Sequence, residues 1–137
     1  MNDNCIFCKI ANGVIGSATV YEDEDFRAIL DIAPSAKGHT LIIPKKHTSD
    51  LLSADDECAA KAFKTAKKIA CAVKKTLNCD GVNILQNNGE AAGQSVFHLH
   101  VHVIPRYKDD KVNIPWETLS YADGEADKLA KDISANL

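Results

Sequence analysis

The sequence lacks several features that would place it in a specialised class of protein. No run of apolar residues approaches the roughly 18 that a transmembrane helix needs. The first four residues, Met1 to Asn4, lack the basic and apolar regions of a signal peptide. Internal repeats and low-complexity segments are also missing. We therefore expect a cytoplasmic protein without a membrane partner, folded as a single domain over residues 1–137.

An excess of positive charge is missing too, and the cysteines are odd in number. The formal net charge is −3, whereas nucleic-acid-binding domains carry a basic surface, so we expect no nucleic-acid partner. A small phosphorylated ligand stays compatible with this charge, because it needs only local hydrogen-bond donors. Five cysteines without an export signal predict reduced thiols rather than disulfides.

The pattern of apolar and turn-forming residues predicts an α+β fold. A long helix is expected to begin with a capping box at Ser53 and Asp56 and to run to about Leu77, with an apolar stripe that includes Phe63. Short helices are expected near 5–12 and 124–136. Short runs bounded by turn residues predict strands at 19–22, 26–30, 39–44 and 82–87, and the apolar, β-branched residues around the last histidines predict another at 95–105. The connections are short enough for antiparallel pairing, which favours α+β over a doubly wound α/β fold.

Three of the five histidines, His98, His100 and His102, alternate along the last predicted strand. Alternate residues of a strand share a face, so three imidazoles would line one side. The opposite, core-facing side would hold Phe97, Leu99, Val101 and Val103. Three interpretations compete: structural histidines, a metal site, or covalent catalysis in which one imidazole attacks phosphorus. The neighbouring segment 93–95, Gly-Gln-Ser, favours catalysis because glycine lets the backbone approach a ligand closely.

These residues resemble the histidine triad superfamily. The segment 98–104 matches the pattern His-φ-His-φ-His-φ-φ that names it, and further blocks match at 5–10, 30–34, 38–47 and 87–95. The whole set looks like the Hint-type branch, in particular bacterial Hit-like proteins. The resemblance implies a five-stranded antiparallel sheet with one long helix and a short C-terminal helix, paired with a second protomer into a ten-stranded sheet. The stretch 107–137 matches least and is expected to form a variable tail.

The resemblance implies an enzyme that hydrolyses or transfers nucleoside 5′-monophosphate groups, typically from purine nucleoside phosphoramidates. His100 would be the nucleophile that forms a nucleotidyl-histidine intermediate, and His102 would hydrogen-bond the α-phosphate. Ser95 matches a hydroxyl near the leaving group. His39 matches a histidine that supports the site, with a packing role as the alternative. Two other functions stay open: a dinucleoside polyphosphate hydrolase, and a nucleotide-binding or partner-binding module without turnover.

The resemblance also implies a binding site for a purine nucleotide. Asp31 would accept the ribose hydroxyls, and a turn-forming aspartate is the alternative. The walls of the base pocket would be Phe7, Ile10, Ile29 and Ile32, although core packing alone could explain any one of these. Phosphate-side contacts would come from Asn87, Gly93 and Gln94, together with the serine and histidines named above.

Cys5 and Cys8 have the spacing of zinc ligands, but a zinc site needs two more. With His100 and His102 assigned to phosphate, His47 and His98 are the best completions. The resemblance to zinc-carrying bacterial proteins supports a structural Cys2His2 zinc site. The alternative is two buried free cysteines beside a surface histidine. Zinc is the only cofactor expected.

Overall fold

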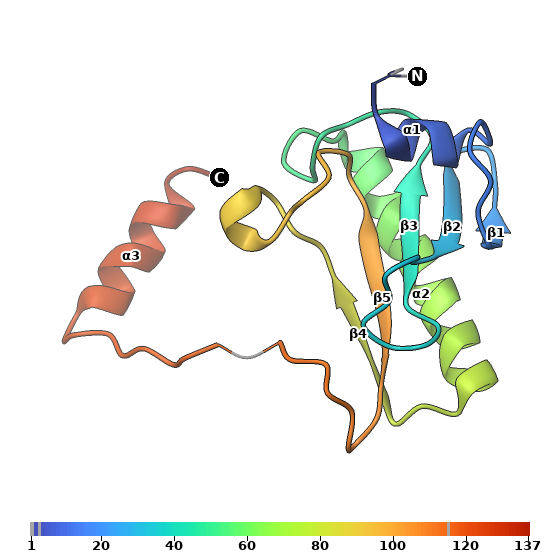
Figure 1. Ribbon diagram of the computed structural model, residues 1–137. Helices are drawn as coiled ribbons and strands as arrows, with labels where there is room; N and C mark the ends of the chain where they lie inside the picture. Colours follow the sequence, from blue (N-terminus) through green and yellow to red (C-terminus); the bar gives the residue numbers. More distant parts are fainter. Residues whose placement is uncertain (1, 3, 115) are drawn as a thin grey trace.

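The computed structural model describes residues 2, 4–114 and 116–137; Met1, Asp3 and Pro115 lie outside the described residues. Its centre is a five-stranded sheet with the order β1-β2-β3-β5-β4, antiparallel throughout (Figure 1). The strands are β1 (Thr19–Glu22), β2 (Phe26–Leu30), β3 (Thr40–Pro44), β4 (Gly81–Leu85) and β5 (Val101–Arg106). The predicted α+β fold is confirmed. Among the described residues, every helix is too short or too polar to cross a membrane.

Helix α2 (Asp56–Leu77) packs against one face of the sheet. It begins at the N-cap Asp55, whose carboxylate accepts the Cys58 N–H at 2.7 Å. The prediction of Ser53 as the N-cap is wrong. Its hydroxyl contacts Thr48 and Ser49 in the preceding turn instead.

Apolar side chains fill both faces of the sheet. Between α2 and the sheet lies a core to which both elements contribute. Its buried residues are Phe26, Ala28, Ile42, Val101 and Val103 from the sheet, and Ala62, Ala66, Ile69 and Val73 from α2. The opposite face buries Ala11, Ile29, Leu41 and Ile43, with Phe7 and Ile10 from helix α1 (Ile6–Ala11) packed against them. Two predicted core residues, Phe63 and Phe97, are instead 47% and 54% exposed. Phe63 lies beside the buried stripe of α2 rather than on it, so that stripe is narrower than predicted.

Strand β5 begins at Val101, later than predicted, so His98 and His100 precede it. Continued beyond the last pair, Ile42 and Val101, the antiparallel register of β3 and β5 would place His100 opposite Ile43 and then Leu99 opposite Pro44. Proline has no N–H to donate, so the ladder ends there. The Leu99 N–H donates to the Thr48 carbonyl at 2.7 Å instead. This irregular segment turns two of the three triad histidines away from regular strand geometry.

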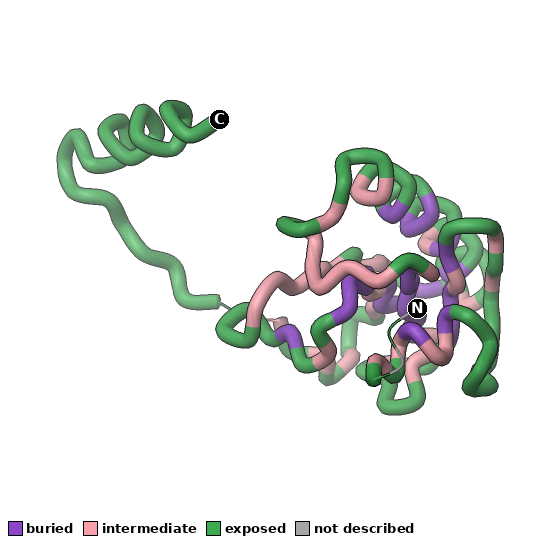
Figure 2. The backbone as a smooth tube through the Cα atoms, turned by 90° about the horizontal axis from the view of Figure 1, so that it is seen from above, coloured by how far each residue is buried: buried purple, intermediate pink, exposed green. Residues whose placement is uncertain are grey.

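The C-terminal segment stands apart from the sheet. After β5 the chain runs in an extended path to α3 (Glu125–Ser134), which projects beside the body and is exposed along its whole length (Figures 1 and 2). Helix α3 confirms the predicted short C-terminal helix. Apolar side chains on this arm are exposed, including Trp116 at 81%. The arm therefore contributes no core to this chain.

Candidate functional site

Three histidines meet where β3 and β5 run side by side. His39 lies just before β3, His102 lies in β5 opposite Leu41, and His100 lies just before β5. The Nε2 atom of His39 is 2.9 Å from Nδ1 of His102. The ring centroids of His100 and His102 are 4.9 Å apart. The fold thus brings together the three histidines that the sequence assigned to phosphate chemistry.

Hydrogen bonds assign the proton on each ring of the His39–His102 pair. The backbone N–H of Ser35 donates to His39 Nδ1 at 3.1 Å, so this nitrogen carries no proton. The proton of neutral His39 must then lie on Nε2, which donates to His102 Nδ1. As a consequence, neutral His102 carries its proton on Nε2. Its Nε2–H is the group available to an anionic ligand.

His100 has the opposite arrangement. Its Nδ1–H donates to the carbonyl oxygen of His98 at 2.7 Å, which leaves the lone pair on Nε2 free. Burial is the main cause that lowers the pKa of His100, so the ring is neutral and nucleophilic near pH 7. The same carbonyl would stabilise positive charge on the ring once Nε2 forms a bond.

The other two rings are neutral for the same reason. Burial, reinforced by the neighbouring His100 and His39, lowers the pKa of His102 to about 4. Burial also lowers the pKa of His39, against an opposing effect of the Asp31 carboxylate. The cluster therefore offers a ligand one free N–H donor, on His102, and one free lone pair, on His100, rather than fixed positive charge.

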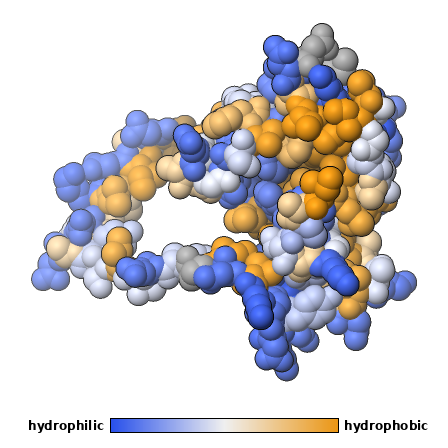
Figure 3. Space-filling model, in the orientation of Figure 1, coloured by the Kyte–Doolittle hydropathy of each residue, from blue (hydrophilic) through white to orange (hydrophobic). Residues whose placement is uncertain are grey.

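A cavity of about 720 Å³ lies beside this cluster, within the range typical of small-molecule sites. Several predicted nucleotide residues line it: Phe7, Ile10, Ile29, Asp31, Ile32 and Ser95. The sequence interpretation missed other parts of its wall: Ile6, Ile15, Gly16, Ser17, Ala18, Leu30, Leu41 and Val96. Apolar side chains gather below the N-terminal end of the chain, over α1 and the nearby strands (Figure 3). The cavity can hold a flat apolar group.

Phe7 and Asp31 join the cavity to the histidines. The ring of Phe7 lies edge-on to His100, with centroids 5.0 Å apart. Asp31 uses one oxygen, Oδ1, to accept the Ala33 N–H at 2.9 Å in a turn. Its other oxygen, Oδ2, lies 3.7 Å from His39 Nδ1. Asp31 therefore forms the turn that one interpretation predicted and still presents a carboxylate oxygen between cavity and histidines.

The predicted phosphate-side residues lie on the loop between β4 and β5. Gln94 is buried, and its side chain accepts the Gly89 N–H and donates to the carbonyls of Ser49 and Val96. The Asn87 amide lies 3.5 Å from the Gly93 carbonyl. These side chains shape the loop, so a ligand contact from Gln94 would have to come from its backbone.

A second cluster holds the four predicted metal ligands. Cys5 and Cys8 come from the start of α1, His47 follows β3, and His98 precedes β5. The Cys8 Sγ atom lies 3.3 Å from His47 Nδ1 and 3.5 Å from His98 Nδ1. The Cys5 Sγ atom lies 3.4 Å from His98 Nδ1, and the two Nδ1 atoms are 3.2 Å apart.

This geometry fits a tetrahedral ion. Zinc bond lengths place the ligand atoms of such a site about 3.3–3.8 Å apart. The Nε2 atom of His98 donates to the Pro44 carbonyl at 2.9 Å, which directs Nδ1 to the ion. All four ligand atoms lie within 4.8 Å of one another, so the cluster could hold a metal ion.

Comparison with known proteins agrees with this architecture. A model of the HIT domain matches residues 12–109. The chain belongs to the HIT family. A HIT-family structure from Bacillus subtilis is 46% identical, with a TM-score of 0.93 and 98% of both chains covered. The histidine triad family inferred from the sequence is thereby confirmed.

Two further relatives of this HIT protein bear on the two clusters. An adenosine 5′-monophosphoramidase of Schizosaccharomyces pombe is 36% identical, with 98% of both chains covered. A zinc-bound histidine triad family structure from Mycobacterium smegmatis is 41% identical, with a TM-score of 0.77, and covers 96% of this chain and 97% of that one. The chain is thus a member of a family of nucleotide-binding proteins and hydrolases.

Proposed function

We propose that this HIT protein hydrolyses purine nucleoside 5′-phosphoramidates through a covalent intermediate on His100. The observation that carries the proposal is the hydrogen-bonding of the three rings. It gives His100 a free lone pair and its neighbour His102 a free N–H. Attack on phosphorus needs such a pair, because one group attacks and another stabilises the oxygens that gain charge. The S. pombe phosphoramidase supports the substrate class.

The nucleotide binds with its base in the cavity and its phosphate at the histidines. The base packs against the apolar wall of Phe7, Ile10, Ile29 and Ile32. The ribose hydroxyls donate to Asp31 Oδ2, the oxygen that the turn leaves available. The α-phosphate accepts from His102 Nε2–H and from backbone groups of the loop that carries Asn87, Gly93 and Gln94.

The reaction then takes two displacements. In the first, the lone pair of His100 Nε2 attacks phosphorus, the P–N bond breaks, and the amine leaves with a proton delivered through the Ser95 hydroxyl or water. In the second, water attacks phosphorus, the P–Nε2 bond breaks, and the nucleoside monophosphate departs. His100 returns to its neutral form. Two displacements replace one difficult step by two easier ones.

We propose that Cys5, Cys8, His47 and His98 hold a structural zinc ion. The ligand distances and the zinc-bound M. smegmatis relative support this assignment. The ion takes no part in the displacements. Its effect reaches them through His98, whose ring binds the ion and whose carbonyl orients His100.

We further propose a cytoplasmic homodimer. Strand β4 is the last strand of the sheet order and pairs only with β5 among the described residues. An unpaired edge can be completed by a second copy, which would give the ten-stranded sheet expected of the family. The five free cysteines suit a reducing compartment.

Trapping the intermediate tests the catalytic proposal. The reaction with adenosine 5′-phosphoramidate is stopped during turnover without the use of acid. The protein is then digested, and its peptides are analysed by mass spectrometry. We expect one adenylyl group on the peptide that contains His100. His100→Ala should lose both the adduct and turnover but still bind AMP, because the cavity and Asp31 remain.

Several results would contradict the proposal. If the adduct lies on another residue, or if His100→Ala turns over as fast as wild type, His100 is not the nucleophile. A higher kcat/KM for diadenosine tetraphosphate than for the phosphoramidate would favour the neighbouring branch of the family. AMP binding without turnover of either substrate would indicate a binding module.

A further inference from the structure

One wall of the cavity is a helix too short to hold its own position. Helix α1 has 6 residues, and isolated helices shorter than about 12 residues are marginal in water. Ile6, Phe7 and Ile10 on this helix line the cavity. The position of the wall must therefore come from contacts between α1 and the rest of the molecule. At its N-terminal end these are made by Cys5 and Cys8 in the metal cluster.

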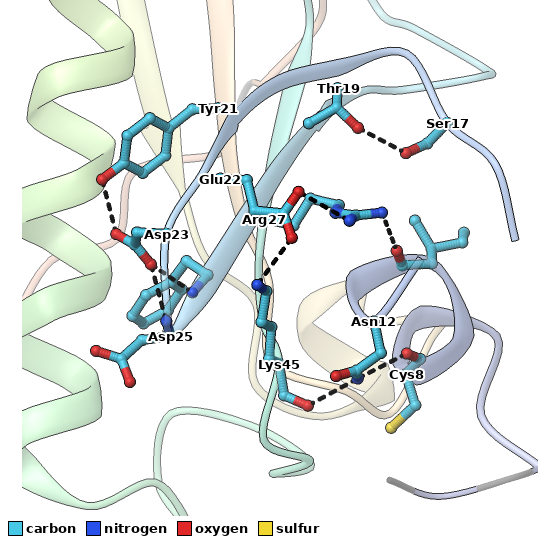
Figure 4. A network of polar contacts seen from close by, with 12 residues as sticks. Cys8, Asn12, Ser17, Thr19, Tyr21, Glu22, Asp23, Asp25, Arg27 and Lys45 are labelled. Atoms are coloured by element: carbon cyan, nitrogen blue, oxygen red, sulfur yellow. Dashed lines mark hydrogen bonds and ion pairs between the residues drawn. The ribbon is translucent and has the colours of Figure 1, made fainter. Parts of the chain in front are cut away.

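Arg27 holds the other end of α1. Its Nη1 donates to the Ile10 carbonyl at 3.0 Å, and its Nη2 donates to Glu22 at 2.8 Å. Lys45 binds the other oxygen of Glu22 at 2.8 Å. A cation that binds a carbonyl at the C-terminal end of a helix also interacts favourably with the helix dipole. Figure 4 shows this network, with Arg27 reaching from β2 toward the helix.

The surroundings of Arg27 fix its position closely. Its side chain is 15% exposed. Gly13, at φ +78°, packs so closely against the guanidinium that a Cβ atom at this position would lie 3.3 Å from Nη2. The Nε atom is buried without a hydrogen-bond partner among the described residues. Leaving a buried donor unpaired is unfavourable, so the two Nη groups must be what keeps this side chain in place.

Arg27 is also close to the cavity without lining it. It lies on β2 two residues before Ile29, and alternate residues of a strand share a face. Ile29 lines the cavity and packs in the same cluster as Ile10, whereas Arg27 is outside the cavity wall. Arg27 therefore does not contact a ligand in the cavity directly, and its hydrogen bond to the Ile10 carbonyl connects it to the cavity wall through α1.

We propose that Arg27 is a positioning residue for the base of the bound nucleotide. It holds the C-terminal end of α1, and with it the Ile10 and Phe7 side chains, against the cavity. This role rests on the proposed function of the cavity as the nucleotide site. The hydrogen bonds that orient the histidines come from outside α1, from the Ser35 N–H to His39 and from the His98 carbonyl to His100. Loss of Arg27 should thus weaken base binding more than it affects the displacement at phosphorus.

The test compares a ligand that has a base with one that lacks it. Affinities for AMP and for ribose 5-phosphate are measured by calorimetry on wild type, Arg27→Met, Arg27→Lys and the control Lys45→Met. Arg27→Met should raise the AMP Kd and the KM about tenfold, the effect of one charge-assisted hydrogen bond. Its kcat and its ribose 5-phosphate Kd should stay within about twofold of wild type.

The two remaining variants keep the proposal falsifiable if Arg27→Met unfolds. Arg27→Lys retains charge but loses the fork that binds two partners, so it should give an intermediate AMP Kd. Lys45→Met removes the side chain that shares Glu22 with Arg27, but it leaves in place the Lys45 carbonyl that accepts from Asn12 at the end of α1, so it should match wild type. An unchanged AMP Kd in both Arg27 variants, or an equal loss for both ligands, would overturn the role of Arg27. Wild type that binds neither ligand would overturn the nucleotide site itself.

Discussion

At the scale of single residues, backbone groups decide what each histidine of the cluster can do. The Ser35 N–H fixes the proton of His39, and that proton fixes the one on His102. The His98 carbonyl fixes the proton on His100. His100 and His102 have chemically identical side chains, yet the first presents a free lone pair and the second a free N–H donor. Because every residue other than proline has a backbone N–H and every residue has a carbonyl, the sequence could name the histidines but could not assign these roles.

The depressed pKa of His102 predicts how stability changes with pH. Its pKa is about 4 in the folded protein and 6.5 ordinarily. Below pH 6.5 the unfolded chain therefore binds a proton that the folded protein does not. The contribution of this ring to stability is present above pH 6.5 and is lost as the pH falls toward 4. The free energy of unfolding should fall by at most about 1.4 kcal/mol per pH unit on this account.

The matched variant for this prediction is His102→Asn, which does not titrate there. Urea unfolding of both proteins between pH 7.5 and about 4.5 gives the two slopes. Taking the difference between the proteins removes contributions that they share, including protonation of the metal cluster. A slope that is equal in the two proteins would show that His102 is protonated alike in the folded and unfolded states.

At the scale of elements, helix α1 connects the two clusters. Cys8 on this helix belongs to the metal cluster, and Phe7, the residue before it, lines the cavity and contacts the ring of His100. One short helix thus carries a residue of the metal cluster next to a residue of the cavity wall. A change at the metal cluster can therefore reach the cavity wall through α1, as well as His100 through His98.

Metal removal is predicted to destabilise the protein. Wild type should contain about one zinc per chain, and Cys8→Ser should contain much less. Its melting temperature should fall by about 5 °C or more, because a structural ion stabilises the fold that binds it. Cys71→Ser, at an exposed position of α2, is the control and should keep both zinc and stability. Plasma emission spectrometry and calorimetry measure the two quantities. Purified wild type without zinc would contradict the assignment.

Elements with a clear pattern could be predicted from the sequence, and departures from pattern could not. The bounds of β1 and β2 follow from the acidic turn at 23–25, which separates the two short strands of a hairpin. The late start of β5 depends on Pro44 of a different strand, which only the pairing register reveals. The N-cap at Asp55 depends on which of several polar residues faces the helix. Phe63 is exposed because the buried stripe of α2 is narrow.

The same limit applies to the candidate site. Motif spacing was enough to name the triad histidines and the Cys5–Cys8 pair, whereas His47 and His98 were reached by elimination and by the resemblance to the family. The cavity wall also includes residues from the segment 15–18, which carry no recognisable pattern. Arg27 looks like an ordinary charged residue of a strand until its contact with Ile10 is seen. Contacts between segments that are distant in the sequence are therefore what could not be predicted from it.

At the scale of the whole molecule, the two edges of the sheet differ. Strand β1 closes one edge and has an irregular register with β2, a feature that discourages further pairing. Strand β4 forms the other edge with a regular register, and Ile84 on it is 42% exposed. Phe63 of α2 is exposed as well. An exposed regular edge with apolar side chains is the kind of surface that a second copy covers.

Oligomeric state tests whether β4 pairs with a second copy. Ile84→Asp places a charge on this edge and should convert a dimer to a monomer, because a buried unpaired carboxylate is strongly unfavourable. Val20→Asp makes the same change on β1, where the side chain is 45% exposed, and should leave the dimer intact. Sedimentation equilibrium at several concentrations distinguishes the two states. If the wild type is a monomer, the proposed dimer is wrong. If only Val20→Asp dissociates the dimer, the interface lies at β1 rather than at β4. If Ile84→Asp dissociates the dimer yet keeps its AMP affinity, the nucleotide site is complete within one chain.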